Sequence, residues 1–467
     1  MKPNPTSGDR MPSGPFNRHS AWPIMVTVAL LSIPVALAAQ EAPATSGDDT
    51  GTQDSPPTVS ETDGETDQDA HLRMRTQTLL YGTFITPQSS SPFNPGNRLA
   101  TLPSDEINAD LRIDLSASAR ACTAYANLRA GYDYVLDADP EPRTSDRSEF
   151  FLNAGGLRCE VGKGVFLSAG REVLQWGSAT LLSPSNPLFV DTGKTNPLSD
   201  IYGKDIAQMT WYANERLTFS VLHNFAVGSR DPDQQNFSPL TAAKLDWIGN
   251  STSGGAILSR DQDGKSRLGL YGTYTYSDAL LVYADVAVGR GHSGWFPLQD
   301  STGAWRFEQT KLDDDFLYTS LLGGAYTFES GWSLTAEWLT GNEGYDRNER
   351  RDYLEAVNQA SNNFLSTPGR SAQLLGTSLA NGQRYLGSDY VFLQILRSEW
   401  NDKADVALRW TGALGTGSGQ ALSASVTYYV TPSLQTFFIG TRASGGADSD
   451  FGRLIEDSML VGLRLYF

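Results

Sequence analysis

The sequence predicts an all-β fold: a transmembrane antiparallel up-and-down β-barrel of about 18 strands, with about 16 as the alternative count. Three observations predict it. Apolar and polar residues alternate with a period of two from residue 71 onward, and the connections between the alternating segments are short and long in turn. The chain also ends on one more alternating segment, "MLVGLRLYF", without a polar tail. The net charge of −17 disfavours nucleic acid as a partner, because nucleic-acid binding needs a basic surface.

Residues 1–38 have the features of a signal peptide. Lys2, Arg10 and Arg18 make a basic stretch, and the apolar run "PIMVTVALLSIPVALA" that follows ends at Ala38 in a small-x-small pattern. This run is shorter than the ~20 apolar residues that a membrane-spanning helix needs. We expect an exported protein that is cut near Ala38, with a retained anchor helix as the alternative.

Residues 39–70 form an acidic segment between this leader and the alternating region. They contain nine Asp and Glu and no Lys or Arg, and Ser, Thr, Gly and Pro make up most of the rest. Such a composition cannot bury enough apolar surface to offset the entropy lost on ordering. We expect a disordered linker, which tethers the barrel or binds a periplasmic partner.

The barrel itself is expected over residues 71–467. In "INADLRIDL" (107–115) every second residue is apolar, and the residues between them are Asn, Asp and Arg. A strand directs such alternate side chains to opposite faces. The same pattern returns at 281–288, 332–338, 405–410 and 421–430. Segment 240–267 alternates weakly, which leaves the strand count open.

The expected connections form two sets, tight turns and long loops, as at the two ends of a transmembrane barrel. The short ones are 117–119, 162–164, 214–216, 277–279, 329–331 and 431–433. The long ones are 85–105, 136–147, 178–204, 289–314 and 341–387.

The last segment is expected to pair with the first. Every backbone N–H and C=O in hydrocarbon needs an internal partner, so a membrane-spanning sheet has to close on itself. We therefore expect residues 459–467 to lie beside residues 71–84. Phe467 would then lie at the membrane–water boundary, where aromatic side chains are favoured.

The two cysteines, Cys122 and Cys159, lie on opposite arms of one predicted hairpin. Pairing them sets Ala124 against Leu157, which keeps apolar groups opposed. Exported proteins meet an oxidising compartment, so we expect a disulfide, with two buried thiols as the alternative. No histidine or third cysteine accompanies them. We expect no metal site, no cofactor and no catalytic residues.

Charged residues that alternate with the apolar face are expected to line the lumen, because a charge that faces lipid costs about 2–4 kcal/mol at mid-bilayer. The expected pore-lining residues are Asp110, Arg112, Asp114, Arg129, Arg171, Asp285, Glu337, Asp405, Arg409 and Arg464. Rows of Arg opposite Asp and Glu would orient polar solutes; alternatively, these charges solvate the wall or pair with each other. The side of Arg171 is open, because segment 165–176 does not alternate cleanly and Gly170 indicates a bulge.

Two long loops are candidates for narrowing the pore. Loop 178–204 is too apolar for a solvated tip, and we expect it to fold into the barrel and bury Leu181, Leu182, Leu188, Phe189 and Val190. Loop 341–387 contains a helical spacing of Leu354, Val357, Ser361 and Phe364. It predicts a helix that acts as a lid or plug, or that caps the rim.

The signal peptide, the alternating strands and the terminal aromatic of "LRLYF" resemble those of Gram-negative outer-membrane β-barrel proteins over residues 71–467. The resemblance implies a location in the cell outer membrane, among outer-membrane lipid and lipopolysaccharide, and a last strand that the barrel-insertion machinery reads. Within this family, "GREVLQWGSATLLSPSNPLF" (170–189) is similar to a stretch of alginate-export-type porins, G-R-x(n)-W-G…P-x-N-P. The matching residues are Gly170, Arg171, Trp176, Gly177, Pro184, Asn186 and Pro187.

The expected function is a porin-like channel for the passive passage of small polar or anionic solutes, saccharides among them. Two alternatives stay open: an export pore for a secreted polysaccharide, and a non-conducting structural or adhesive barrel. We expect no enzyme, because no serine partner is identifiable for any of the four histidines. The pattern does not decide between a monomer and an oligomer.

Overall fold

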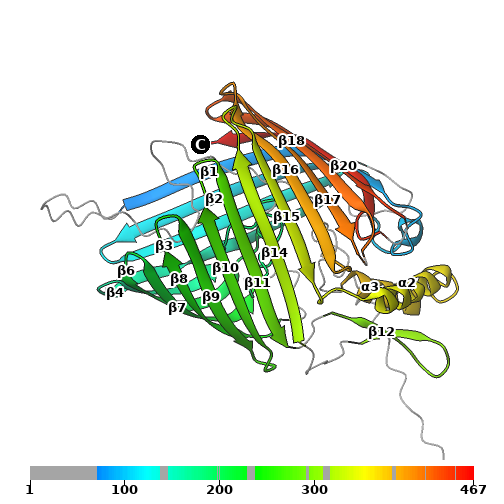
Figure 1. Ribbon diagram of the computed structural model, residues 1–467. Coiled ribbons are helices and arrows are strands. Elements are labelled where there is room, and N and C mark those ends of the chain that lie inside the picture. The colour runs from blue at the N-terminus through cyan, green and yellow to red at the C-terminus, as the bar shows by residue number, and fades with distance from the viewer. Residues whose placement is uncertain are drawn as a thin grey trace, which may run out of the picture.

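The computed structural model describes residues 71–467 except 137–145, 197, 199, 229–236, 291–293, 309–315, 381–384, 416 and 447–448. This part of the chain forms one closed antiparallel barrel of 18 strands (Figure 1), which confirms the predicted fold class. The expected signal peptide and acidic linker lie outside the described residues. The barrel strands are β1 (His71–Pro87), β2 (Asp105–Ala119), β3 (Cys122–Val135), β4 (Asp146–Gly162), β5 (Val165–Glu172), β6 (Lys204–Asn214), β7 (Leu217–Val227), β8 (Leu240–Ile248), β9 (Thr252–Asp261), β10 (Ser266–Thr275), β11 (Leu280–Arg290), β14 (Phe316–Thr327), β15 (Ser333–Gly341), β16 (Asp389–Trp400), β17 (Ala404–Leu414), β18 (Gln420–Thr431), β19 (Leu434–Ser444) and β20 (Ile455–Tyr466).

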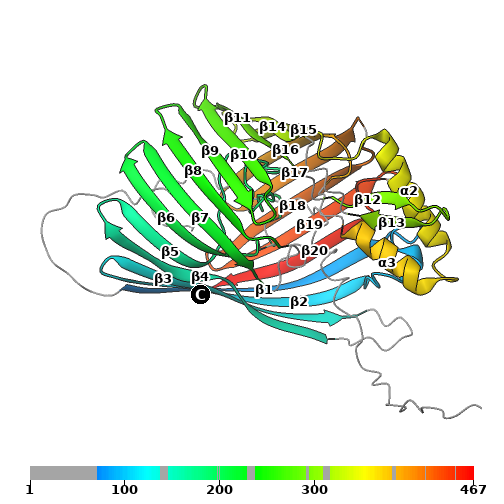
Figure 2. The same cartoon turned by 90° about the horizontal axis from the view of Figure 1, so that it is seen from below.

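The barrel closes where the sequence predicts. Strand β20 pairs antiparallel with β1, from Gln77 opposite Tyr466 to Phe84 opposite Met459 and beyond. The backbone N–H of Phe467 donates to the carbonyl of Thr76 at 2.9 Å, so the terminal residue is fixed to the first strand. Figures 1 and 2 show the C-terminus beside β1.

The two faces of the wall differ as the alternation predicts. On β17, Leu408 is exposed on the outside, whereas its neighbours Ala407 and Arg409 are buried inside. Large apolar side chains are exposed on strands around the whole ring, among them Trp211, Trp247, Trp338, Phe438 and Leu463. An exterior this apolar suits hydrocarbon rather than water. The weakly patterned segment 240–267 contributes two strands, β8 and β9.

The two ends of the barrel carry connections of different length. Tight connections at one end run through 120–121, 163–164, 215–216, 249–251, 276–279, 328–332, 401–403 and 432–433. One predicted turn was wrong: residues 117–119 belong to β2, and the turn is at Arg120, which adopts a left-handed φ of 53°. The longer loops lie at the other end, together with the short connection 262–265.

A disulfide joins Cys122 to Cys159, as predicted. The register also sets Ala124 opposite Leu157 in the β3–β4 pair. The bond lies close to the short-turn end, where it ties β3 to β4 directly.

The long loops pack together over one end of the barrel (Figures 1 and 2). They contain the 3-10 helix η1 (Pro95–Asn97), the hairpin of β12 (Phe296–Gln299) and β13 (Trp305–Glu308), and the helices α2 (Arg347–Asn362) and α3 (Pro368–Leu379). Residues from four loops share one apolar cluster, including Phe93, Phe296, Tyr353, Leu375 and Leu454.

The predicted helix in loop 341–387 exists as α2, which begins with a capping box at Asp346. Its buried face was only partly predicted, and α3 was missed. The fully buried apolar residues of α2 are Tyr353, Ala356, Val357 and Ala360, of which the prediction named Val357. No helix among the described residues is long and apolar enough to cross a membrane.

Gly170 permits close packing of strands and does not mark a bulge. It pairs with Gly156 on one side and Ile206 on the other, without a register shift at this position. A Cβ on Gly170 would lie 2.3 Å from the carbonyl oxygen of Gly155 and 2.4 Å from the Cα of Gly156. Only glycine fits there, which explains the break in the alternation.

Candidate functional site: the loop inside the barrel

The connection between β5 and β6, residues 173–203 (the β5–β6 loop), folds into the lumen. Five apolar residues of this loop were expected to be buried. Leu181, Leu182, Leu188 and Phe189 are buried, and Val190 is 39% exposed. Leu181 and Leu182 share an apolar cluster with inward side chains of the far wall, such as Leu321 and Phe392. Burial of these side chains stabilises the loop in the lumen rather than outside it.

Two carboxylates on the far wall hold the first half of the loop. Glu337 of β15 accepts hydrogen bonds from the backbone N–H groups of Thr180 (2.6 Å) and Leu181 (2.7 Å). The hydroxyl of Tyr283 donates to the same carboxylate at 2.5 Å. Glu337 is 2% exposed, so these bonds replace its hydration, as a buried charge requires.

Asp285 of β11 also accepts hydrogen bonds from the loop, a few residues after those that bind Glu337. It accepts from the hydroxyl of Ser183 at 2.7 Å and from the backbone N–H of Ser185 at 2.5 Å. Gly269 on β10 lets the loop pass close to the wall, because a Cβ there would lie 2.4 Å from the carbonyl oxygen of Ser185. Glu337 therefore binds two backbone N–H groups of the loop, and Asp285 binds one backbone N–H and one hydroxyl.

Two arginines hold the end of the loop. Arg112 of β2 donates to the carbonyl of Leu198 at 2.6 Å and pairs with Asp200 at 3.4 Å. Arg129 of β3 pairs with Asp200 at 2.8 Å and with Asp114 at 2.9 Å. These side chains are partly hydrated, with 12% of Arg112, 11% of Arg129 and 22% of Asp200 exposed.

The anchors show that the loop crosses the barrel. Strand β15, which carries Glu337, is eight strands from β5 in one direction round the ring and ten in the other. Glu337 and Asp285 also lie in the middle of their strands, Ser333–Gly341 and Leu280–Arg290. The loop is therefore attached at mid-height on nearly opposite sides of the lumen.

Residues of the motif at 170–189 shape this loop. The Asn186 side chain accepts from the backbone N–H groups of Leu188 (3.0 Å) and Phe189 (2.9 Å) and donates to the carbonyl of Leu174 (2.9 Å). Gly177 adopts a φ of +82°, which favours glycine. The buried Trp176 ring lies 4.7 Å from the Lys244 amine, within cation–π range.

Lys194 lies on the loop and bonds to it. Its amine donates to the carbonyls of Ala179 (3.0 Å) and Gly177 (3.4 Å). Burial lowers the pKa of this amine, while the carboxylates of Glu337 and Asp285 act in the opposite direction.

Three further predicted residues lie on the inner face and bond to neighbours in the wall. Asp405 accepts from the hydroxyl of Tyr429 and from the backbone N–H of Glu399. Arg409 is 1% exposed and donates to Gln394 at 2.6 Å. Arg464 lies 3.5 Å from Gln435. Asp110 also faces inward, where the hydroxyl of Tyr81 donates to it at 3.4 Å.

Arg171, which was counted with the pore-lining residues although its side was open, lies on the outer face. It has the same strand parity as the exposed Leu167 and Ala169, which assigns it to the outer face. There it pairs with Asp205 through two bonds, at 2.8 and 3.0 Å. Its neighbour Glu172 is buried on the inner side.

Sequence reasoning missed several lumen residues. Asp200 and Lys194 lie within a loop, where no periodicity exists to assign a face. Lys244 lies in the weakly alternating segment, although Ala242 and Asp246 share its face and could have indicated it. Among the described residues, no group of three His, Cys, Asp or Glu could hold a metal ion.

No known family profile matches the sequence, and no curated protein matches it. Solved structures do match. OccK11 (OpdR) of Pseudomonas aeruginosa superposes with a TM-score of 0.50 at 9% sequence identity, covering 85% of this chain and 96% of that one. The outer membrane protein OpdK of P. aeruginosa gives a TM-score of 0.48 at 9% identity, covering 85% and 99%. OccK9 (OpdG) of the same species gives 0.49 at 11% identity, covering 85% and 99%.

The likeness to OccK11 concerns the fold, and it agrees with the closed ring and its apolar exterior. The chain has the porin-like barrel fold of a Gram-negative outer-membrane protein.

Proposed function

We propose that this barrel is a passive channel for small polar or anionic solutes, saccharides among them, and that the β5–β6 loop forms its constriction. The observation that carries the proposal is the attachment of this loop at mid-height by Glu337 and Asp285 on one side and by Arg112 and Arg129 on the other. A loop held there reduces the cross-section without closing the barrel at either end.

The size of the ring supports a conducting function. Barrels of 16–18 strands enclose an aqueous path, whereas barrels of about eight are filled by their own side chains. By this rule of size, a ring of 18 strands is wide enough to hold one folded loop beside an aqueous path.

The chemistry of the wall supports a polar solute. Acidic and basic side chains alternate along the inner face, as in the pairs Arg129–Asp114 (2.9 Å) and Lys244–Asp246 (3.1 Å). The opposite wall carries partly exposed amides and hydroxyls on its inner face, such as Gln435 and Ser425. Fixed donors and acceptors of both kinds can replace the hydration of a small polar molecule as it passes.

Planar-bilayer recording tests the proposal. The purified barrel should give discrete conductance steps in potassium chloride and in potassium acetate, and small saccharides or organic anions should reduce the current in a concentration-dependent way. A polymeric polysaccharide that blocks more strongly than its monomers would favour the export pore. Absence of conductance, also in a variant without residues 343–387, would support a structural barrel instead.

A further inference from the structure

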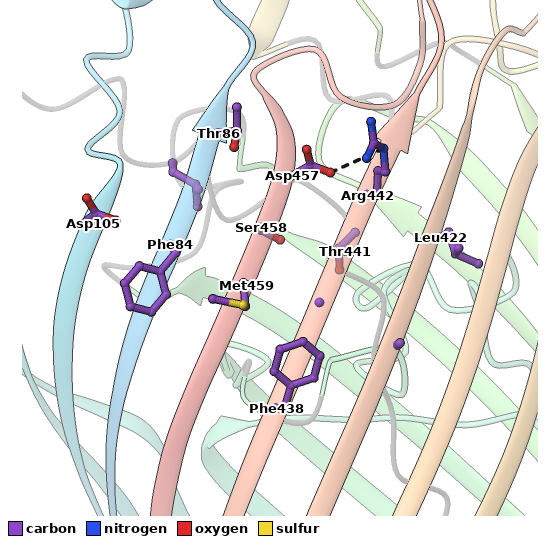
Figure 3. Close-up of a pocket in the computed structure, with 13 residues that line it drawn as sticks. Phe84, Thr86, Asp105, Leu422, Phe438, Thr441, Arg442, Asp457, Ser458 and Met459 are labelled. Carbon is purple, nitrogen blue, oxygen red and sulfur yellow. Dashed lines mark ion pairs between the residues drawn. The ribbon is translucent and has the colours of Figure 1, made fainter.

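A groove of about 530 Å³ lies on the outer wall, away from the loop and the lumen. It spans strands β1, β20, β19 and β18 near their long-loop ends (Figure 3). Four exposed apolar side chains border it: Phe84, Leu422, Phe438 and Met459. By the alternation along their strands, these four residues point to the outer face of the barrel. The groove therefore opens towards the membrane.

Small residues make the groove. Gly440 pairs with Met459 on one side and with Ala424 on the other, so two neighbouring strands lack large side chains at the same height. A Cβ on Gly440 would meet the Phe438 ring at 3.2 Å, which means that this ring already covers one edge of the gap. The result is an apolar notch between the larger outward side chains that border it.

A cation lies directly above the notch. Arg442 follows Gly440 on the same face of β19, and it is paired in register with Asp457 of β20. The two charges are 3.7 Å apart, and 69% of the Arg442 side chain is exposed. Figure 3 shows this pair above Met459 and Phe438. A second carboxylate, Glu456, lies 3.9 Å from the guanidinium. Exposed pairs this loose are weak, so the guanidinium N–H donors can still bind a ligand.

We infer that this groove binds the lipid A part of a lipopolysaccharide molecule, with an acyl chain in the notch and a phosphate on Arg442. Each half of the site matches one half of an amphiphile: apolar surface lies on the membrane side, and a cation lies at the rim. The long loops of outer-membrane barrels are extracellular, so this rim borders the outer leaflet, where the phosphorylated lipid of a Gram-negative outer membrane is lipopolysaccharide.

Native mass spectrometry of the detergent-solubilised barrel, titrated with purified lipid A, measures this binding. The wild type is expected to bind one lipid A in preference to further copies. Arg442→Gln should weaken this first binding step by about ten-fold, the effect of losing one charge-assisted hydrogen bond. Gly440→Leu, which fills the notch, should weaken it similarly while leaving the phosphate contact intact.

Two matched variants control for general changes in the outer wall. Arg260 is exposed at the long-loop end of β9, and Gly272 has outward parity on β10, where a Cβ would have 3.6 Å to its nearest neighbour. Arg260→Gln and Gly272→Leu should bind lipid A like the wild type. Lipid A without its phosphates should bind wild type and Arg442→Gln equally.

Equal binding by all five proteins would overturn the inference. Phosphatidylglycerol that binds as tightly as lipid A, with the same dependence on Arg442, would assign the groove to a phospholipid and also contradict it. Heat-modifiable migration in gels verifies that each variant has a folded barrel. None of these outcomes bears on conductance, so the inference stands or falls separately from the proposed channel.

Discussion

The two ends of the β5–β6 loop are held by opposite chemistry. At the far wall, Glu337 and Asp285 are almost fully buried and accept hydrogen bonds chiefly from loop N–H groups. At the near wall, Arg112 and Arg129 keep contact with water and pair with one loop carboxylate, Asp200. The far-wall attachment is buried and binds three backbone N–H groups and one hydroxyl of the loop, whereas the near-wall attachment is partly hydrated and binds the Asp200 carboxylate and the Leu198 carbonyl.

This difference implies unequal strength. A hydrogen bond to a buried charge contributes about 1.5–3 kcal/mol, and removing the charge also leaves the loop N–H groups without a partner. A fully exposed ion pair contributes only about 0–1 kcal/mol, and a partly hydrated pair is weakened in the same direction because water and salt screen it. The far-wall attachment should therefore determine whether the loop stays in the lumen, and the near-wall attachment should mainly set the local charge.

The largest effect is expected for Glu337→Ala. The change removes the acceptor of Thr180, Leu181 and Tyr283, so the loop should detach and the single-channel conductance should rise several-fold. Asp405→Asn is the matched control, because Asp405 also faces the lumen but accepts from Tyr429 and Glu399. A conductance of Glu337→Ala equal to that of the wild type would show that this attachment does not hold the loop.

A smaller effect is expected for Asp285→Asn. The amide oxygen can still accept from Ser185 or Ser183, so the loop should loosen without leaving the wall. Recordings should show a modest rise in mean conductance and more frequent fluctuations between current levels. An effect larger than that of Glu337→Ala would reverse the ranking of the two carboxylates.

Asp200→Asn should alter selectivity more than conductance. It removes the charge that Arg112 and Arg129 share, while Arg129 keeps Asp114 and the loop keeps its far-wall attachment. The reversal potential in a potassium chloride gradient should shift towards anion preference. If conductance rises as strongly as in Glu337→Ala, the near-wall ion pairs hold the loop as firmly as the buried carboxylates.

No change in conductance is expected when both Cys122 and Cys159 are replaced by serine, because the disulfide joins two wall strands far from the loop attachments. The barrel should nevertheless unfold more easily. A cross-link that closes 37 residues stabilises by roughly 2–4 kcal/mol. Thermal unfolding in detergent measures this loss. A change in conductance would mean that the loop depends on the short-turn end of the wall.

Periodicity explains which features the sequence could predict. Alternation in strands such as 405–410 assigns inner and outer faces residue by residue. Asp285, Glu337 and Arg409 were expected to face inward on this ground, and their side chains are buried. Gly170 breaks the period through a close strand contact, so the sequence could not assign Arg171 beside it to a face.

The ligands of the inward charges could not be predicted. Glu337 and Asp285 bind backbone N–H groups, which every non-proline residue offers, so no sequence signal marks positions 180, 181 and 185. The apolar character of the loop predicted only that its side chains are buried against some other part of the protein. The strands against which the loop packs are determined by tertiary structure. The same holds for the face of α2 that is buried, which contains Tyr353.

The central claim, that the β5–β6 loop narrows a conducting barrel, is tested most directly by replacing residues 178–199 with a short Gly-Ser linker. Single-channel recording of this variant, after its folded state is verified by heat-modifiable migration, should show a conductance several-fold above that of the wild type and weaker block by saccharides. A folded variant with the conductance of the wild type would contradict the account.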